Sequence, residues 1–237
     1  MKKGFLLFIS ICCLFSCDKP KPDSHQQILF KAFMSAVSDG DIEEVSNLIS
    51  KGVDINGVDE NGYSSLFIAL RRKKRAMFEY LLKQGANPNL RIDNRTTLLS
   101  FSFLFNESSF LDLALKYGGD PNQEVEYMGN NKMSLLYYLI HLPLAHEGSN
   151  KLKILINHGA DLKAKYHNLN AVAVCVNCNK YEFAYILLKA GAPYSTDPTQ
   201  LSLLFLLKTK KMDVDDPEYV WRNKIVKFLQ KKGSLSE

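Results

Sequence analysis

The sequence contains few of the residues and motifs from which catalytic and metal-binding sites are usually built. Its 237 residues include five cysteines, five histidines and one tryptophan. It has no glycine-rich phosphate-binding or dinucleotide-binding loop, no GxSxG motif and no HExxH motif. His141 and His146 stand near Glu147, but Pro143 lies between the two histidines and argues against a shared helical face. We therefore expect no catalytic centre, no bound metal and no cofactor.

The chain also has little net charge. Its formal charge is +5 at pH 7, and its aromatic residues show no pattern suited to base stacking. Both observations argue against a nucleic-acid partner. The chain is 46% hydrophobic and 23% charged, which are ordinary values for a globular protein. A chain of this length can bury one core or form a continuous stack of small units.

No hydrophobic run is long enough to span a membrane comfortably. The longest begins at Phe5 and ends at Phe15, after the basic residues Lys2 and Lys3. Eleven residues are too few to cross a hydrocarbon layer of about 30 Å as a helix. A basic start followed by a short apolar run is typical of a secretory signal peptide.

The end of this run, Leu14-Phe15-Ser16-Cys17, resembles the bacterial lipobox. The resemblance implies a signal peptide over residues 1–16, cleavage before Cys17 and lipidation of its thiol. Residues 17–27 would then be the lipidated cysteine and a stiff, Pro-rich tether. Asp18 resembles the retention signal of enteric lipoproteins, which implies the periplasmic face of the inner membrane. An ordinary signal peptide that happens to end in a cysteine is the alternative.

A 33-residue period organises the remainder, residues 28–237. Asn56, Asn89 and Asn122 are spaced by 33 residues, and each follows a glycine that ends a short apolar segment. Two further copies of this block contain Gly159 and Gly191. The pattern predicts repeated pairs of short helices, with a left-handed glycine cap after each second helix. A single unit cannot bury its apolar stripe, so we expect the units to stack.

Capping signals support this register. Asp41 with Glu44 has the spacing of a capping box, and the segment 179–182 (Asn-Lys-Tyr-Glu) repeats the arrangement. Asp216-Pro217 is an N-cap followed by proline at the first helical position. We therefore expect second helices to begin just after these caps.

The repeated block resembles the ankyrin repeat, whose second helix ends in two leucines before a Gly-Ala-Asp-x-Asn turn. The best copy spans residues 59–91, with Ser64-Ser65-Leu66-Phe67 at the family's Thr-Pro-Leu-His position. The fourth unit carries about four extra residues in its finger and about four more between its helices. The resemblance implies an all-α ankyrin-repeat helical solenoid of about five to six helix-turn-helix units with short fingers, over residues 28–237.

Three other features have competing interpretations. Cys175 and Cys178 indicate a buried thiol at a small core position, equivalent to Ala69, or alternatively a disulfide in an oxidising compartment. His158, before its glycine, is expected to be a structural cap. The basic run at residues 71–75 and the matching Lys208, Lys210 and Lys211 suit a solvated turn, an acidic partner or anionic lipid headgroups.

The ankyrin resemblance implies protein binding through finger tips and the exposed face of the first helices. Tyr, Met and Arg side chains are typical of such interfaces. Mapped onto this chain, the expected binding residues in the fingers and first helices are Glu60, Asn61, Tyr63, Arg71, Arg72, Arg91, Asp93, Asn94, Phe105, Glu124, Glu126, Tyr127, Met128, Tyr166, His167 and Asn177.

Together, these expectations favour a protein-binding lipoprotein that is a monomer when unbound. The chain resembles ankyrin-repeat immunity lipoproteins paired with phospholipase effectors of type VI secretion. It would then be anchored in the periplasm, where it would neutralise a secreted lipase toxin. The alternative is a periplasmic assembly or stress factor that supports a resident enzyme.

Overall fold

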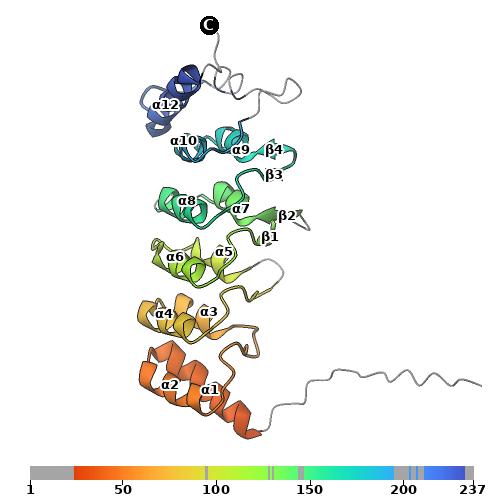
Figure 1. Ribbon diagram of the computed structural model, residues 1–237, viewed down its shortest axis with the longest axis vertical. Coiled ribbons are helices and arrows are strands. Elements are labelled where there is room, and N and C mark those ends of the chain that lie inside the picture. The colour runs from red at the N-terminus through yellow and green to blue at the C-terminus, as the bar shows by residue number, and fades with distance from the viewer. Residues whose placement is uncertain are drawn as a thin grey trace, which may run out of the picture.

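A computed structural model describes residues 24–93, 96–127, 129, 131–143, 147–194, 203, 207 and 211–232. Pairs of antiparallel helices stack on one another into a single elongated array (Figure 1). The five pairs are α1 (Ser24–Asp39) with α2 (Ile42–Ser50), α3 (Ser65–Arg71) with α4 (Arg75–Lys83), α5 (Leu98–Ser102) with α6 (Ser109–Lys116), α7 (Leu135–His141) with α8 (Gly148–Asn157), and α9 (Ala171–Asn177) with α10 (Tyr181–Lys189). A longer helix, α12 (Pro217–Lys231), packs on α10 at the C-terminal end.

The first helix begins at Ser24, upstream of the predicted start of the repeat domain at residue 28. Its inner residues Phe33 and Val37 are fully buried against the rest of the array. The predicted signal peptide, Cys17 and the first part of the tether lie outside the described residues.

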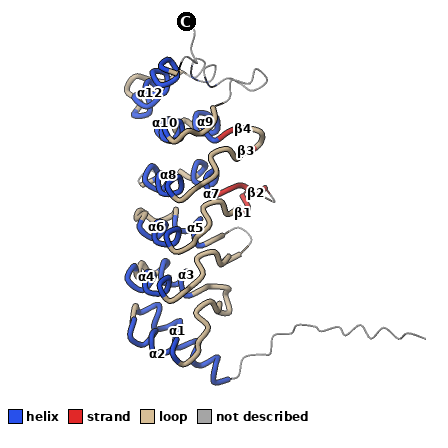
Figure 2. The backbone as a smooth tube through the Cα atoms, viewed as in Figure 1, coloured by secondary structure: helices blue, strands red, loops and turns tan. Residues whose placement is uncertain are grey.

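The fold is mostly helical but not all-α as predicted, because two of the fingers form short antiparallel hairpins (Figure 2). Strand β1 (Glu124–Tyr127) pairs with β2 (Asn131–Ser134), and β3 (Lys165–Tyr166) pairs with β4 (Leu169–Asn170). In the longer hairpin Val125 lies opposite Met133, and both side chains are buried. The extra finger residues of the fourth unit therefore give the strands enough length to pair and to anchor one face on the core.

Every predicted glycine cap adopts the left-handed conformation. Gly52, Gly85, Gly118, Gly159 and Gly191 have φ between 86° and 94°. After each of these glycines, the next residue's N–H donates back to a carbonyl of the second helix, as in Ala86 N to Leu81 O at 3.0 Å. This hydrogen bond closes the helix and turns the chain toward the next finger.

The asparagines of the 33-residue period join successive turns. Asn56 Oδ1 accepts from the backbone N–H of Asn87 at 2.7 Å, and Asn89 Oδ1 accepts from Asp120 N at 2.8 Å. Asn122 Oδ1 accepts in the same way from Asp161 N at 2.7 Å. The sequence separations are 31, 31 and 39 residues, so the last step contains the eight or so extra residues predicted for the fourth unit.

This asparagine ladder ends at the fourth turn. Lys163 stands where the earlier turns have asparagine, and Pro193 stands where the next backbone donor would lie. The side-chain acceptor and the N–H donor of that step are therefore both missing, since proline has no N–H.

The last helix docks through a different contact. Glu218 Oε2 accepts from the backbone N–H of Glu182 at 2.9 Å, so a carboxylate of α12 covers the start of α10. The predicted cap at residues 179–182 was wrong: Asn179 has φ of 57°, and α10 has no local side-chain cap. The predicted caps at Asp41 and Asp216 are confirmed, with Asp41 Oδ1 accepting from Glu44 N at 3.0 Å.

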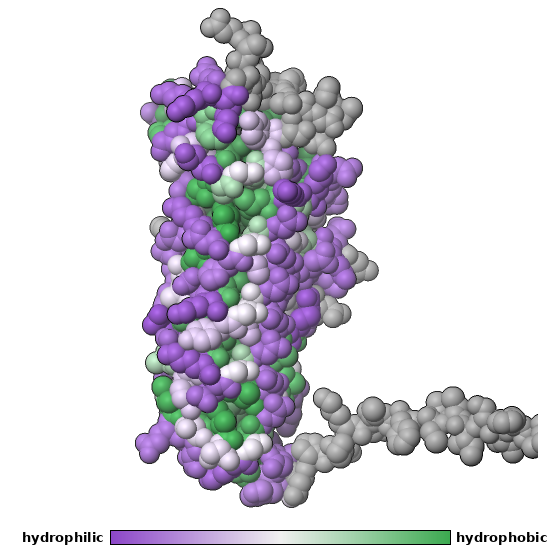
Figure 3. Space-filling model, viewed as in Figure 1, coloured by the Kyte–Doolittle hydropathy of each residue, from purple (hydrophilic) through white to green (hydrophobic). Residues whose placement is uncertain are grey.

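The core runs as one cluster from α1 to α12. Figure 3 shows hydrophobic residues in a broken line along the array, bordered by hydrophilic ones. Cys175 is fully buried at a small core position, as predicted, and its burial raises the pKa of its thiol well above the usual value. Cys178 is exposed, and both thiols are free.

Replacing Asn89 by alanine should lower the free energy of unfolding by about 1–3 kcal/mol. The substitution removes the acceptor for Asp120 N and the amide that donates to Gly118 O at 2.8 Å. Lys163→Ala is the matched control, because Lys163 has no ladder partner, and its effect should stay within about 0.5 kcal/mol. Urea unfolding followed by circular dichroism measures both; equal losses would show that the ladder does not couple the turns.

Candidate protein-binding surface

The fingers and the first helices form one side of the array, which we call the inner face. In Figure 1, α3, α5, α7 and α9 lie on the same side as the loops and hairpins that precede them, while α4, α6, α8 and α10 form the other row. Positions predicted to bind a partner thus come together on one continuous surface, although they are more than 100 residues apart in sequence.

The predicted binding residues differ in exposure. Exposed members are Glu60, Asn61, Arg71, Arg72, Arg91, Asp93, Glu124, His167 and Asn177; half-buried members are Tyr63, Phe105, Glu126, Tyr127 and Tyr166. Asn94 and Met128 lie outside the described residues. The prediction therefore selected mostly accessible side chains, and its aromatic members are the ones that pack partly against neighbours.

One predicted position was wrong in its local structure. Phe105 does not lie on a first helix, because α5 ends at Ser102. Beyond this point the chain makes short-range turn bonds, from Leu104 N to Phe101 O and from Phe105 N to Ser102 O. The hydroxyl of Ser102 also donates to Leu99 O at 2.6 Å.

A buried lysine from the next unit holds the segment after α5. Lys151 of α8 is 1% exposed, and its ammonium donates to Phe103 O at 2.9 Å and to Phe105 O. It stands at the helix position that Met77 and Phe183 occupy in other units. Burial lowers the pKa of Lys151, whereas the nearby Glu147 carboxylate acts in the opposite direction. The ammonium thus satisfies carbonyls that a longer α5 would have bonded internally.

A second contact fixes the same segment. The hydroxyl of Ser108 donates to Glu147 Oε2 at 2.7 Å, and this hydrogen bond lowers the pKa of Glu147. Glu147 itself has φ of 58°. The residues added between α7 and α8 thus reach back to the preceding unit and fix its shortened helix.

An aromatic row crosses the inner face from the second unit to the third. Ring centroids are separated by 4.7 Å between Tyr63 and Phe67, by 4.8 Å between Phe67 and Phe101, and by 5.5 Å between Phe101 and Phe105. The guanidinium of Arg71 lies 5.6 Å from the centroid of the Tyr63 ring. These distances favour attraction between the rings and between ring and cation.

A second aromatic cluster joins the two hairpins. His141 at the end of α7 lies 5.6 Å from Tyr127 of β1 and 5.6 Å from Tyr166 of β3, measured between ring centroids. The Nδ1 of His141 is 2.7 Å from the carbonyl oxygen of Tyr137, which identifies Nδ1–H as the donor. The ring orientation is thereby fixed, and the hairpins are held side by side.

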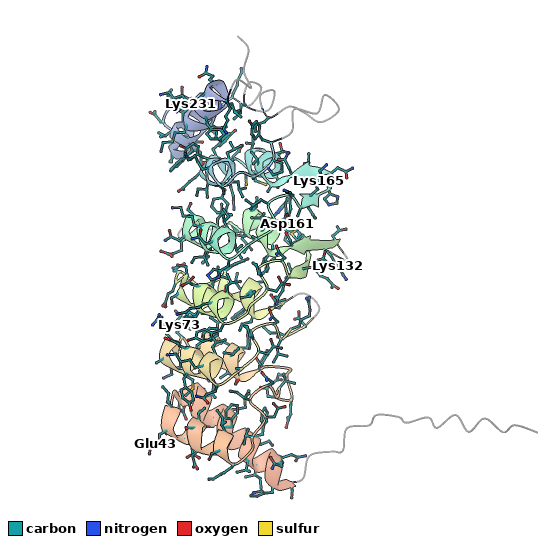
Figure 4. The ribbon with its side chains drawn as sticks, viewed as in Figure 1. Glu43, Lys73, Lys132, Asp161, Lys165 and Lys231 are labelled. Carbon is teal, nitrogen blue, oxygen red and sulfur yellow. The ribbon has the colours of Figure 1, made fainter. Side chains whose placement is uncertain are left out.

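The finger tips are polar. Arg91 Nη1 donates to the backbone oxygen of Glu124 at 2.9 Å, and this hydrogen bond joins the finger before α5 to the finger before α7. Figure 4 shows Lys132 and Lys165 extending outward from the two hairpins. A hollow of about 490 Å³ lies between the finger that carries Arg91 and the β1–β2 hairpin, and both Arg91 and Lys132 line it.

Several inner-face residues were missed from the sequence, among them Phe101, Leu104, Tyr138 and His141. Leu104 carried a usable signal, because it stands 33 residues after Arg71 and therefore places an apolar side chain at an exposed position. Tyr138 and His141 had no such signal, since their contacts depend on the inserted hairpin.

The other residues singled out in the sequence are a histidine beside a glycine turn, possible metal ligands and a basic run. His158 caps the end of α8, as predicted, and its Nε2 lies 3.1 Å from Asp112 Oδ1. Within the described ranges, no group of three or more His, Cys, Asp and Glu side chains could hold a metal ion. His146, Lys208 and Lys210 lie outside those ranges. No helix in the described part of the chain is both long and apolar enough to span a bilayer.

Comparison with known proteins agrees with this repeated architecture. A family model described as ankyrin repeats, in three copies, matches residues 8–92, and the same pair of helices behind a finger recurs as far as α10. The chain contains ankyrin repeats. Ankyrin repeats generally mediate protein–protein interactions, which makes the inner face the candidate surface for binding a partner.

Individual relatives match parts of this ankyrin array. A fowlpox virus protein named as an ankyrin repeat protein is 27% identical over 106 residues, covering 44% of this chain and 18% of the relative. One from Borreliella burgdorferi is 32% identical over 75 residues, covering 30% of this chain and 34% of the relative. The human ankyrin repeat domain-containing protein 40 is 42% identical over 52 residues, covering 22% and 14%. The matches thus span about a third or less of each relative.

Substituting Lys151 by methionine should destabilise the protein by about 1–3 kcal/mol, because the carbonyls of Phe103 and Phe105 would lose their donor inside the protein. The control is Lys153→Met, an exposed position on the same helix, where the change should stay within about 0.5 kcal/mol. Urea unfolding of both variants tests the difference. A Lys151→Met variant as stable as wild type would show that Lys151 does not hold the segment after α5.

Proposed function

We propose that this protein is a membrane-anchored periplasmic binding module that neutralises a secreted toxin, and that the toxin is a phospholipase delivered by type VI secretion. It binds its target through the inner face and has no catalytic role of its own. The observation that carries the proposal is the arrangement of half-buried aromatic side chains in two clusters on one rigid face, with charged side chains around them.

The physical character of this face suits a tight protein complex. Tyr, Phe and Arg side chains held in place by neighbours lose little conformational freedom on binding. Tyr127 and Tyr166 are held by His141, and Tyr63 is held by Phe67 and Arg71. A partner that covers both clusters would bury several preorganised anchors at once.

The lipoprotein-like N-terminus supports the proposed location. Lipidation at Cys17 would keep the binding module at the membrane surface that a phospholipase attacks. Confinement to that surface raises the effective concentration of the inhibitor at the point of damage. The resemblance to ankyrin immunity lipoproteins is the basis for proposing that the toxin is a phospholipase.

Anchoring can be tested by metabolic labelling with a fatty acid. Labelled lipid should enter the wild-type protein and should not enter Cys17→Ala, because the lipobox-like motif places the acyl group on that thiol. Cys178→Ala is the control, since Cys178 is exposed but lies within the repeats, and it should label like wild type. Equal labelling of wild type and Cys17→Ala would contradict the lipoprotein assignment.

Protection should depend on the second aromatic cluster. In competition with a toxin-delivering strain, recipients that carry Tyr127→Ala with Tyr166→Ala should lose protection, because both hairpin anchors are removed. The control is Tyr80→Ala, a half-buried tyrosine on a second helix away from the inner face. Melting temperatures of the purified variants confirm folding.

A recipient that lacks the gene altogether provides the decisive comparison. If it survives as well as its parent, the immunity function is excluded. Capture of a resident periplasmic enzyme through the same face would then explain the clustered aromatic and charged side chains of the inner face.

A further inference from the structure

The third unit has a shortened first helix, and this leaves the inner face hollowed. Helix α5 has five residues, whereas α3, α7 and α9 have seven each. Two hollows meet at the side chain of Leu104. One, of about 310 Å³, is lined by the aromatic rings of Tyr63, Phe67 and Phe101, and the other, of about 390 Å³, is lined by Lys73 and Phe105.

The side chain between the two hollows is unusually accessible for its type. Leu104 is 59% exposed, although its neighbours Phe101 and Phe105 are half-buried. An exposed leucine inside an aromatic-lined depression costs free energy in water, which a covering apolar group would recover. We call this combined depression, centred on Leu104, the Leu104 groove.

The Leu104 groove is held open by contacts beneath it. The buried ammonium of Lys151 bonds the carbonyls of Phe103 and Phe105, on either side of Leu104 in the chain. The hydrogen bond from Ser108 to Glu147 fixes the end of the same loop. The backbone of the groove is therefore fixed by side chains of the following unit, as a preformed binding site requires.

The acidic side chains around the groove accept hydrogen bonds from nearby residues, whereas its basic side chains form no ion pair among the described residues. Asp93 Oδ1 accepts from the backbone of Thr96 at 2.6 Å, and Glu107 accepts from the hydroxyl of Ser109, so both nearby acids are held by their own chain. Arg72 and Lys73 are exposed at the basic end, and Arg71 reaches over Tyr63. None of these three cations forms an ion pair with a carboxylate in the described part of the chain.

We propose that the Leu104 groove receives an acidic, apolar segment of the partner protein. A Leu or Phe side chain of that segment would cover Leu104 and pack against Phe67 and Phe101. Flanking carboxylates would pair with Arg71, Arg72 and Lys73. The inference rests on the proposed role as a protein-binding module and adds the chemistry of the bound segment.

Two other occupants of the groove are a second copy of the chain and an anionic membrane, and each can be distinguished from an acidic segment by experiment. A second copy of the chain would offer its own exposed surface, and its binding would change the oligomeric state. An anionic membrane would satisfy the three cations, but a flat headgroup layer has no side chain to fill the depression around Leu104. Both alternatives therefore give results that differ from those of an acidic segment.

The experiment uses the full-length chain and three fluorescein-labelled peptides, followed by fluorescence anisotropy. The acidic peptide has a Phe-Leu pair flanked on each side by two glutamates. The second replaces the glutamates by lysines, and the third replaces the Phe-Leu pair by two alanines. The acidic Phe-Leu peptide should bind, and the other two should bind at least about tenfold more weakly, a difference of about 1.4 kcal/mol.

Variants of the groove complete the test. Leu104→Glu and Arg71→Glu should each weaken binding of the acidic peptide by about tenfold or more, through the lost apolar contact and the reversed charge. The matched controls are Val220→Glu, at a valine that is 56% exposed on α12, and Lys153→Glu on α8. Both controls should bind like wild type, and circular dichroism of each variant checks the fold.

The following results would overturn the proposal. One is equal binding of the acidic and basic peptides, or no binding at about 1 mM peptide, which corresponds to a free energy weaker than about −4 kcal/mol. Another is a dimer in sedimentation velocity that Leu104→Glu dissociates, which would assign the groove to a second copy. The last is binding to phosphatidylglycerol vesicles, but not to peptide, that Arg71→Glu removes. If Leu104→Glu still protects in the competition assay while the gene deletion does not, the groove assignment fails and the proposed function stands.

Discussion

The structure depends on the constraint that no single helix pair can bury its own apolar stripe. Each stripe becomes part of a core only when the next pair packs on it, so the core is a continuous column from Phe33 in α1 to Leu229 in α12. Stacking alone would allow neighbouring units to slide or rotate against each other. The asparagine side chains between successive turns supply the directional bonds that fix the first four units to one another.

The parts of the fold that follow the 33-residue period could be predicted from sequence, because one register determines several residues at once. The left-handed glycines, the caps at Asp41 and Asp216 and the buried Cys175 all followed from it. The strands of the longer hairpin, β1 and β2, could not be predicted in the same way, since they form where the chain departs from the period. Their pairing depends on contacts such as Val125 with Met133 across an inserted turn.

On the binding surface, too, residues that follow the repeat could be predicted and those that depart from it could not. The repeat register places residues such as Arg91, Glu124 and Asn177 on the inner face and predicts that they are accessible. It does not predict that α5 ends early, because the carbonyls after α5 are bonded by a lysine 48 residues away that replaces an apolar core residue. A buried ammonium is a rare substitute for a methionine or phenylalanine, and its effect appears on the surface of the preceding unit and not at its own position.

The loss of the ladder at Lys163 and Pro193 has a consequence for cooperativity. In a linear array, the size of the unit that folds together is set by the weakest coupling between neighbours. Asparagine bonds join units one to four, up to Asp161. The fifth pair is joined to the fourth by other contacts, such as the hydroxyl of Tyr137 donating to Ala164 O, and α12 is joined to α10 by the bond from Glu182 N to Glu218. The chain therefore has a natural boundary after Asp161 within its continuous core, beyond which the fifth pair and α12 can open as a separate foldon while the units joined by the ladder stay assembled.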